Sequence, residues 1–281
     1  MNAYEYAVRA NGSFALPDTC FKIKALMEDE NSTIEDFANL ISIDPSLTSR
    51  LLQIANSAIY SFQGEISTIS RAITIIGTQV LYNMMLIDVA ATAFKHFSNQ
   101  AIDLKRFWRM SVFCGLATKN LAIKAGIRDI ERLFVAGLLQ NFGELIVAST
   151  SPELAKSCEQ YSAKKLPWAL QKECLGFTYT EVSAELLSIW QIPEKIILPI
   201  RHYNKAYSNQ INKDVTILYL ASRLALIDSH SDEYTYEDMI DEKLFESLKI
   251  TSDDLVNAAN FASKESENIL NIMNVKLYTR R

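Results

Sequence analysis

Signals that begin and end α-helices follow one another closely along this chain. Ser32-Thr33-Ile34-Glu35 fits the capping-box pattern, in which two side chains near a helix start satisfy each other's backbone N–H groups. Asp44 precedes Pro45, which places an N-cap residue before a proline at the first helical position. Gly77 and Gly126 follow apolar residues at helical spacing and are typical of helix ends. No stretch shows the alternation of a half-buried strand, so the sequence predicts an all-α fold.

Composition supports this prediction. The chain has 8 Gly and 6 Pro among 281 residues, less than half of the roughly 12% that these residues make up on average. From the apolar spacing and the caps we expect helices over about 34–41, 45–55, 69–76, 78–97, 103–125, 130–148, 214–227 and 252–273, and three more that begin at Pro152, Pro167 and Pro193. Asp214 is the expected cap of the helix over 214–227.

Charge and cysteine content narrow the class of protein. The net charge is −5, which suits a soluble cytoplasmic protein and argues against nucleic acid as the main partner. The four cysteines are far apart and show no metal-binding spacing, so we expect reduced thiols. We also expect no secretory leader and no membrane insertion, because no apolar run approaches ~18 residues. Nothing in the sequence indicates a cofactor.

The N-terminal half carries a series of motifs at specific spacing. These are Ile41-Ser42-Ile43-Asp44-Pro45-Ser46-Leu47, the run from Leu51 to Tyr60 that contains Ala55-Asn56-Ser57, and Ala72-Ile73-Thr74-Ile75-Ile76-Gly77. In this order they resemble the HDOD domain, the HD-related output domain of bacterial signalling proteins. The resemblance covers about residues 14–210. Its motif residues in this chain are Asp44, Pro45, Leu47, Ala55, Asn56, Ser57 and Gly77.

The same motif residues also have a purely structural interpretation. Pro45 lacks the N–H that would have no partner at a helix start. Asn56 and Ser57 stand where that helix is expected to end, and their side chains can satisfy free carbonyls there. The alternative is a polar cluster that recognises a partner.

The resemblance implies a domain organisation. An N-terminal helical lobe, about 14–97, would pack on an HD-like helical bundle, about 98–210. Residues 211–281 would form a C-terminal helical extension packed on the same core. Within that extension, the stretch from Asp228 to Asp254 holds ten Asp or Glu against two Lys. We interpret it as a solvated surface segment, with an acidic docking face as the alternative.

Proteins of the related HD phosphohydrolase superfamily bind metal through His and Asp residues from several helices, and this chain departs from that pattern. Ala136 to Leu145 resembles the helix that carries the His-Asp pair, but the pair here is Gln140-Asn141. Leu175 to Ala184 resembles a second ligand segment, with Tyr179 at the His position. Near Arg109, where the first His is expected, none occurs. Only His202 is of a ligand type, and one His cannot hold a catalytic divalent ion.

The resemblance therefore implies a remnant of the metal site without catalytic residues and without metal ligands. Its expected members are Arg109, Gln140, Asn141, Tyr179, Arg201 and His202. Lining a cleft, these side chains would offer many hydrogen-bond donors and would suit a phosphate-bearing ligand. The alternative is that the old site is filled by side chains bonded to one another or to the backbone.

These observations leave three functional hypotheses. The first is a non-catalytic regulatory module of bacterial signal transduction that acts through contacts with signalling proteins. The second is a divergent metal-dependent phosphohydrolase, which needs ligands that the sequence does not supply. The third is a sensor of a nucleotide second messenger such as cyclic-di-GMP.

Overall fold

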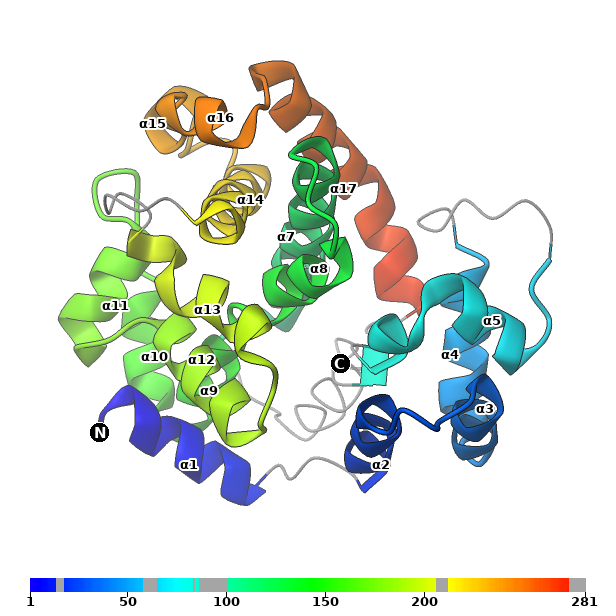
Figure 1. Cartoon of the computed structure of the whole chain (residues 1–281). Coiled ribbons are helices and arrows are strands. Elements are labelled where there is room, and N and C mark those ends of the chain that lie inside the picture. Colours follow the sequence, from blue (N-terminus) through cyan, green and yellow to red (C-terminus); the bar gives the residue numbers. More distant parts are fainter. Residues whose placement is uncertain (14–17, 58–64, 83, 86–100, 206–211, 273–281) are drawn as a thin grey trace. The chain divides into compact units, whose positions relative to one another are not determined.

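The computed structural model describes residues 1–13, 18–57, 65–82, 84–85, 101–205 and 212–272 (Figure 1). Within these residues every regular element is a helix, apart from an isolated bridge between Ser162 and Lys165. The predicted all-α fold is confirmed. Of the helix predicted over 78–97, residues 86–97 lie outside the described part of the chain.

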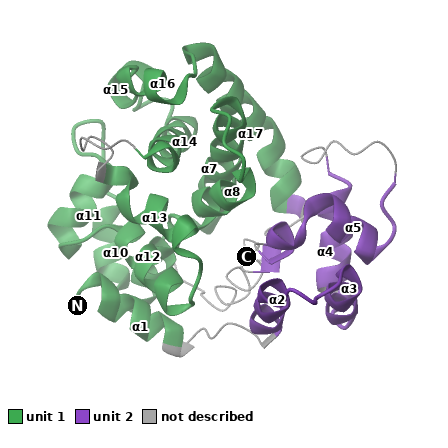
Figure 2. Cartoon of the chain, viewed as in Figure 1, with its two compact units in different colours: residues 1–14, 96–270, 279–281 green, residues 15–95, 271–278 purple. Residues whose placement is uncertain are grey.

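The chain forms two compact units (Figure 2). Unit 1 comprises residues 1–14, 96–270 and 279–281, and unit 2 comprises residues 15–95 and 271–278. Residues 211–270 therefore belong to the same unit as residues 98–210. The division of the chain into an HDOD domain over 14–210 and an extension stays a prediction.

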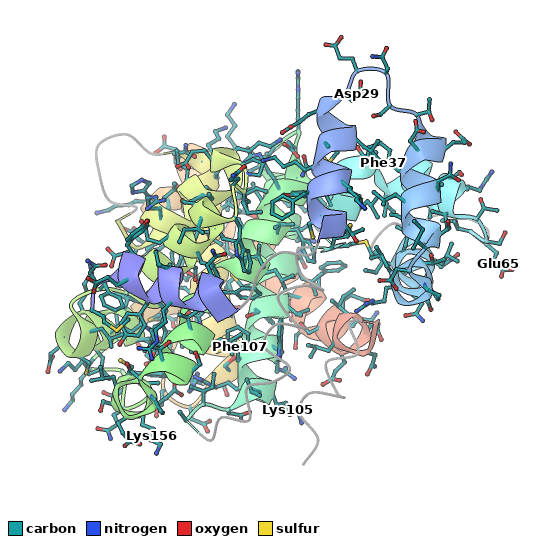
Figure 3. All side chains as sticks on the ribbon, turned by 90° about the horizontal axis from the view of Figure 1, so that it is seen from below. Asp29, Phe37, Glu65, Lys105, Phe107 and Lys156 are labelled. Carbon is teal, nitrogen blue, oxygen red and sulfur yellow. The ribbon has the colours of Figure 1, made fainter. Side chains whose placement is uncertain are left out.

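Unit 2 contains the helices α2 (Asp18–Glu28), α3 (Ile34–Ser42), α4 (Pro45–Ala55) and α5 (Ile69–Ile76). Their apolar faces meet in a core of side chains that are at most 4% exposed: Ile23, Phe37, Ile41, Leu47, Leu51, Ala55, Ile66, Ala72 and Ile73. Figure 3 labels Phe37 on α3. The core follows from the helical spacing of these residues in the sequence.

Local capping fixes the helix ends in unit 2. The capping box of α3 is formed by Thr33 and Asp36, one residue later than the Ser32–Glu35 pair that the sequence suggested. Both pairs have the required spacing, and Thr33 is the residue that adopts the extended N-cap conformation. Gly77 ends α5 with a φ of 85°, a conformation that glycine adopts without a steric penalty.

Unit 1 is a larger helical bundle. Its helices are α1 (Ala3–Ser13), α7 (Leu104–Lys124), α8 (Ile130–Leu139), α9 (Phe142–Thr150), α10 (Pro152–Cys158), α11 (Pro167–Leu175), α12 (Tyr179–Ile189), α13 (Glu194–His202), α14 (Lys213–Ser229), α15 (Tyr236–Met239), α16 (Lys243–Leu248) and α17 (Ser252–Ile272). α7 packs against both α8 and α14. Phe107, Phe113 and Phe142 are almost completely buried in this unit, and Figure 3 shows Phe107 on α7.

α7 and α8 approach each other closely because glycines lie at their crossing. A Cβ added to Gly137 would lie 2.7 Å from Thr118 Oγ1 and 2.8 Å from the Cα of Gly115. These distances are shorter than real Cβ contacts, so no larger residue fits there without a shift of backbone. The close approach positions α8, and the turn that follows it, against α7.

The stretch 130–148, predicted as one helix, is divided in the structure. α8 ends at Leu139 and α9 begins at Phe142, with Gln140 and Asn141 in the turn between them. Just after this turn α9 lies close to α12: a Cβ at Gly143 would lie 2.0 Å from the carbonyl oxygen of Tyr179. Gln140 keeps right-handed helical dihedrals, with φ −57° and ψ −30°, whereas Asn141 departs from them with φ −105° and ψ 13°.

Taken together, α8 and α9 form the stretch Ile130–Thr150, which is long and apolar enough to cross a membrane. No other helical stretch among the described residues meets that test. Of its most apolar window, 78% is buried inside the protein. Burial of this kind is typical of a core helix.

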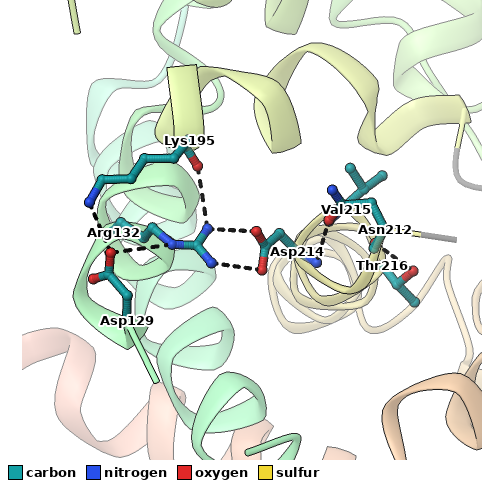
Figure 4. A network of polar contacts seen from close by, with 7 residues as sticks. All are labelled: Asp129, Arg132, Lys195, Asn212, Asp214, Val215 and Thr216. Carbon is teal, nitrogen blue, oxygen red and sulfur yellow. Dashed lines mark hydrogen bonds and ion pairs between the residues drawn. The ribbon is translucent and has the colours of Figure 1, made fainter. Parts of the chain in front are cut away.

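A charged network ties α8, α13 and α14 together (Figure 4). Arg132 donates two hydrogen bonds to Asp214, from Nη1 to Oδ2 at 2.6 Å and from Nη2 to Oδ1 at 3.0 Å. Asp129 pairs with Arg132 at 3.5 Å and with Lys195 at 3.0 Å. The prediction that Asp214 caps α14 is wrong: Asn212 caps it, because the Asp214 carboxylate is engaged by Arg132.

Two further differences concern helix starts. Pro193 is the N-cap of α13, so the helix begins at Glu194, one residue later than predicted. The acidic stretch from Asp228 to Asp254 contains two short helices, α15 and α16, that the sequence analysis did not predict. Met239, Leu244 and Leu248 anchor these helices in the core.

Candidate functional site

A pocket lies in unit 1 where α7, α9, α11, α12 and α14 meet the turn between α8 and α9. It is lined by Arg106, Met110, Gln140, Asn141, Glu144, Cys158, Glu159, Tyr161, Pro167, Trp168, Gln171, Tyr179, Thr180, Tyr203, Asn204, Ser222 and Leu226. Its cavity volume is about 60 Å³. That is room for a few water molecules, far less than the roughly 300 Å³ at which ligand pockets begin.

The structure brings together three of the six residues predicted for a remnant cleft. Gln140, Asn141 and Tyr179 line the pocket. The other three do not line it. Arg109 pairs with Asp228 at 3.1 Å, and Arg201 pairs with Glu185 and donates to Ser188 Oγ at 2.9 Å. His202 is exposed at the end of α13.

The cation in the pocket is Arg106, one turn before Arg109 on α7. Its guanidinium lies 2.6 Å from Glu144 Oε1 and 2.8 Å from Glu159 Oε2, and it donates to Tyr161 Oη at 2.6 Å. Asn141 donates to the other carboxylate oxygen of Glu144. The Tyr161 hydroxyl in turn lies 3.2 Å from His230 Nε2. One guanidinium therefore serves two carboxylates that the fold holds close together.

Glu144 is the most buried charge of this network, with 3% of its surface exposed. Burial raises the pKa of its carboxyl to about 7, and Arg106 offsets only part of that rise. Glu159 adds to the increase because it shares the same guanidinium. Burial and Arg106 together lower the pKa of His230, which favours the neutral imidazole beside Tyr161. The pocket is thus a desolvated site whose carboxyl can change charge near neutral pH.

Tyr179, at the position where the HD pattern has a His, is 2% exposed. Its backbone N–H donates to Gln171 Oε1 at 2.9 Å, and the carbonyl oxygen accepts from Ser183 Oγ at 3.1 Å. The hydroxyl is buried and makes no hydrogen bond of normal geometry with any described residue. Burial and the nearby Glu144 carboxylate raise the pKa of this phenol well above its usual range, so it stays neutral.

Gln140 is held by Tyr203, another residue that lines the pocket. Tyr203 donates from its hydroxyl to Gln140 Oε1 at 2.6 Å. Behind Tyr203, the guanidinium of Arg223 lies 3.6 Å from the ring centre of Tyr219 and 4.2 Å from that of Trp168, distances typical of cation–π contacts. The side chains at positions 140 and 141 are therefore both engaged by the protein itself.

The residues of the pocket do not fit a divalent metal. The ligand positions hold the neutral donors Gln140, Asn141 and Tyr179, whereas metals prefer imidazole, thiolate or carboxylate. Both carboxylates of the pocket are paired with Arg106. A metal here would have to displace a guanidinium or lie beside it. Across the described residues, no group of three His, Cys, Asp or Glu side chains stands at metal-binding distance.

The motif residues of the N-terminal half lie in unit 2 and have structural contacts. Asp44 accepts from the Leu47 N–H at 3.1 Å at the start of α4, where Pro45 is the first residue. Asn56 donates to the carbonyls of Leu52 and Ile66, each at 2.8 Å, and accepts from the Ile66 N–H at 2.9 Å.

Three more motif residues lie on α4 or directly after it. Ser57 donates to the Ile54 carbonyl at 2.7 Å. Leu47 and Ala55 are buried in the core of unit 2. The motif thus closes α4 and fastens the chain that follows it.

Sequence reasoning missed Arg106, Glu144 and Glu159. A signal was present: Phe142 to Ala148 is apolar except for Gly143 and Glu144, and a lone carboxylate on a buried helix requires a cationic partner. The sequence did not identify Arg106 as that partner, since α7 carries basic residues at 105, 106 and 109.

Comparisons with known proteins identify the family and the fold. A sequence model of the HDOD domain matches residues 14–206. A Treponema pallidum protein described as uncharacterized is 25% identical over 222 residues, which are 77% of this chain and 43% of that protein. The chain thus spans less than half the length of this relative.

Several solved structures share the fold. A candidate phosphohydrolase from Shewanella amazonensis superposes with a TM-score of 0.71 at 22% identity over 98% of both chains. A candidate signal transduction protein from Marinobacter aquaeolei gives 0.70 at 21% identity, over 92% of this chain and 58% of the other. An HDOD domain protein of unknown function from Geobacter sulfurreducens gives 0.62 at 18% identity, over 98% and 95%.

Proposed function

This chain belongs to the HDOD domain family, and from that premise we propose that it is a non-catalytic regulatory module of bacterial signal transduction. It acts in the cytoplasm through contacts with signalling proteins. One observation carries the proposal: the side chains at the positions of the HD pair are used by the protein itself. Gln140 accepts from Tyr203, and Asn141 donates to Glu144. The side chains at the metal-ligand positions of the HD pattern thus serve here to hold neighbouring segments together.

The remnant cleft is part of this proposal in a reduced form. Gln140, Asn141 and Tyr179 belong to it, with Arg106 in place of the expected Arg109. Hydrogen bonds and two ion pairs join the side chains that line the pocket, and its cavity volume is about 60 Å³. A cavity of that size favours a structural role over a nucleotide sensor, because a cyclic dinucleotide needs a pocket several times larger.

The experiment that tests the proposal is an activity and metal assay on the full chain purified without chelator. We expect less than about a tenth of an equivalent of any divalent metal, since the donor set is neutral. We also expect no hydrolysis of phosphomonoesters, nucleotides or cyclic dinucleotides above the buffer blank with Mg²⁺ or Mn²⁺ added. Turnover that Gln140→Ala or Asn141→Ala abolished would overturn the proposal and restore a phosphohydrolase.

The sensor hypothesis is tested separately by thermal shift with cyclic-di-GMP and mononucleotides. A ligand at about 100 times its dissociation constant adds roughly 2.7 kcal/mol of stability. We expect no shift at millimolar ligand. A shift that Arg106→Gln removed, while Arg109→Gln kept it, would place a nucleotide in the pocket and contradict a purely structural role.

The regulatory role itself is tested in a strain that lacks this protein. The measurement is whether a chain supplied to that strain restores its signalling output. We expect the wild-type chain and a Gln140→Ala/Asn141→Ala chain to restore it equally at equal protein level. Failure of the double variant at wild-type level would show that the pocket, and not the surface, carries the function.

A further inference from the structure

A groove lies on unit 1, well apart in sequence from the residues that match the HDOD domain. The short helices α15 and α16 and the first turns of α17 enclose it, and α15 and α16 lie against α14 at one end of the unit (Figure 1). Its lining residues are Tyr236, Glu237, Ile240, Glu242, Phe245, Ser252, Leu255 and Val256. The cavity volume is about 470 Å³, within the range of roughly 300–1,000 Å³ that binding pockets have.

The floor of the groove is apolar and partly exposed. Val256 and Tyr236 are 45% and 37% exposed, and both line the same groove. Ile240 and Phe245 are half-buried beside them, and Leu255 closes the floor. Five apolar side chains thus meet in one concave surface, and apolar surface gathered in this way marks interaction sites.

The rim of the groove is acidic. Glu237 and Glu242 are lining residues, both exposed, and neither forms an ion pair with any residue that the structure describes. The surrounding segment, Asp228 to Asp254, carries ten acidic residues and only two lysines. The groove therefore combines an apolar floor with an uncompensated negative rim.

We propose that this groove docks a cationic amphipathic helix of a partner protein. Large apolar side chains of that helix would fill the floor over Val256, and its Lys or Arg residues would pair with Glu237 and Glu242. Helix-in-groove binding uses this combination of apolar anchors and complementary charge. The inference goes beyond the function proposed above, because it assigns a surface outside residues 14–206 and does not use the Arg106 pocket.

The test uses the full chain and a fluorescein-labelled helical peptide. The peptide is about 18 residues long, so that it can form a helix, with Leu at i, i+3, i+4 and i+7 and Lys elsewhere. Fluorescence anisotropy is expected to show 1:1 binding. Glu237→Lys/Glu242→Lys should weaken it at least tenfold, and Val256→Asp should weaken it through the floor. All three positions are exposed, so the fold should be kept, which circular dichroism checks.

The matched control is Glu30→Lys/Glu65→Lys, which makes the same change of net charge at two exposed positions of unit 2. Figure 3 labels Glu65. This variant should bind like the wild type. The proposal would be overturned by any of three results. These are no binding of the peptide, equal weakening of binding in the control variant, and equal binding of a peptide with Glu in place of Lys.

A second occupant is tested in the same assay. Residues 273–281 of the chain itself include Lys276, Arg280 and Arg281 beside Val275 and Leu277. If a chain ending at Ile272 bound the peptide tenfold more tightly, the groove would belong to the chain's own terminus and the partner assignment would be wrong. Unchanged affinity supports the partner. None of these results bears on the metal and activity assays, so the two proposals fail separately.

Discussion

At the scale of the residue, Arg106 is the side chain on which the candidate site depends. It pairs with Glu144, which is almost fully buried, and with Glu159. Removing one partner of a buried ion pair is costly because the other charge is left without compensation, whereas exposed pairs contribute little. Arg109, three residues later, forms a comparable pair with Asp228 but is 39% exposed. The two arginines are therefore a natural matched pair.

We predict that Arg106→Met lowers the free energy of unfolding by about 3 kcal/mol, and that Arg109→Met lowers it by at most about 1 kcal/mol. Urea denaturation followed by tryptophan fluorescence measures both, because Trp108, Trp168 and Trp190 all lie in unit 1. Arg106→Met/Glu144→Gln should recover part of the loss. Equal losses for the two arginines would show that the buried network contributes no more than a surface pair.

Glu144 gives the protein a predicted dependence on pH. Its pKa is about 7 in the folded chain against an ordinary 4.5. The folded state therefore binds more protons between these values. Its contribution to stability is fully present below about pH 4.5 and is lost as pH rises through about 7.

The comparison is with Glu144→Gln, which cannot titrate. We expect the stability of the wild type relative to this variant to fall by up to about 3 kcal/mol between about pH 4.5 and about pH 8. Urea titrations across that range measure it. A difference that stayed constant or rose with pH would mean that Arg106 keeps Glu144 ionised throughout.

At the scale of the element, helix crossings decide where the pocket forms. The α7–α8 crossing needs glycine at 137 and is tight at 115, where an added Cβ would lie 3.0 Å from the carbonyl oxygen of Phe134, and the α9–α12 contact needs glycine at 143. Both contacts hold the turn with Gln140 and Asn141 in place. The sequence places glycines inside apolar helices, where they cost helix stability, and the structure supplies the packing reason.

We predict that Gly137→Ala lowers the free energy of unfolding by about 1–3 kcal/mol, the usual cost of overpacking. The added methyl would meet Thr118 Oγ1 and also backbone atoms of Cys114 and Gly115. Thr118→Ala should therefore fail to rescue it, which chemical denaturation of the double variant checks. Full rescue would show that only the threonine side chain, and not the backbone approach, limits the crossing.

At the scale of the whole molecule, the chain has a net charge of −5 and an acidic segment in unit 1. Nucleic-acid binding depends on neutralising phosphates with basic residues. We predict no complex with duplex DNA or RNA in a gel-shift assay at about 0.15 M salt and micromolar protein. A complex that weakened steeply with salt would reveal a basic patch and contradict this expectation.

Several helix ends follow from the sequence alone, because capping bonds join residues only a few positions apart. Pro152 and Pro167 open α10 and α11, and Gly77 ends α5, as predicted. It also identified Gln140, Asn141 and Tyr179 as pocket residues, through the family pattern and not through physics.

Which side chains pair with each other depends on the tertiary structure. Arg106 and not Arg109 faces Glu144, because a shift of one helical turn places a side chain in a different contact. Asn212, and not Asp214, caps α14. The Asp214 carboxylate is bound instead by Arg132, which is 82 residues away in the sequence. Gly143 on α9 lies directly against the backbone of Tyr179 on α12. Such contacts join distant segments, and local sequence rules cannot specify them.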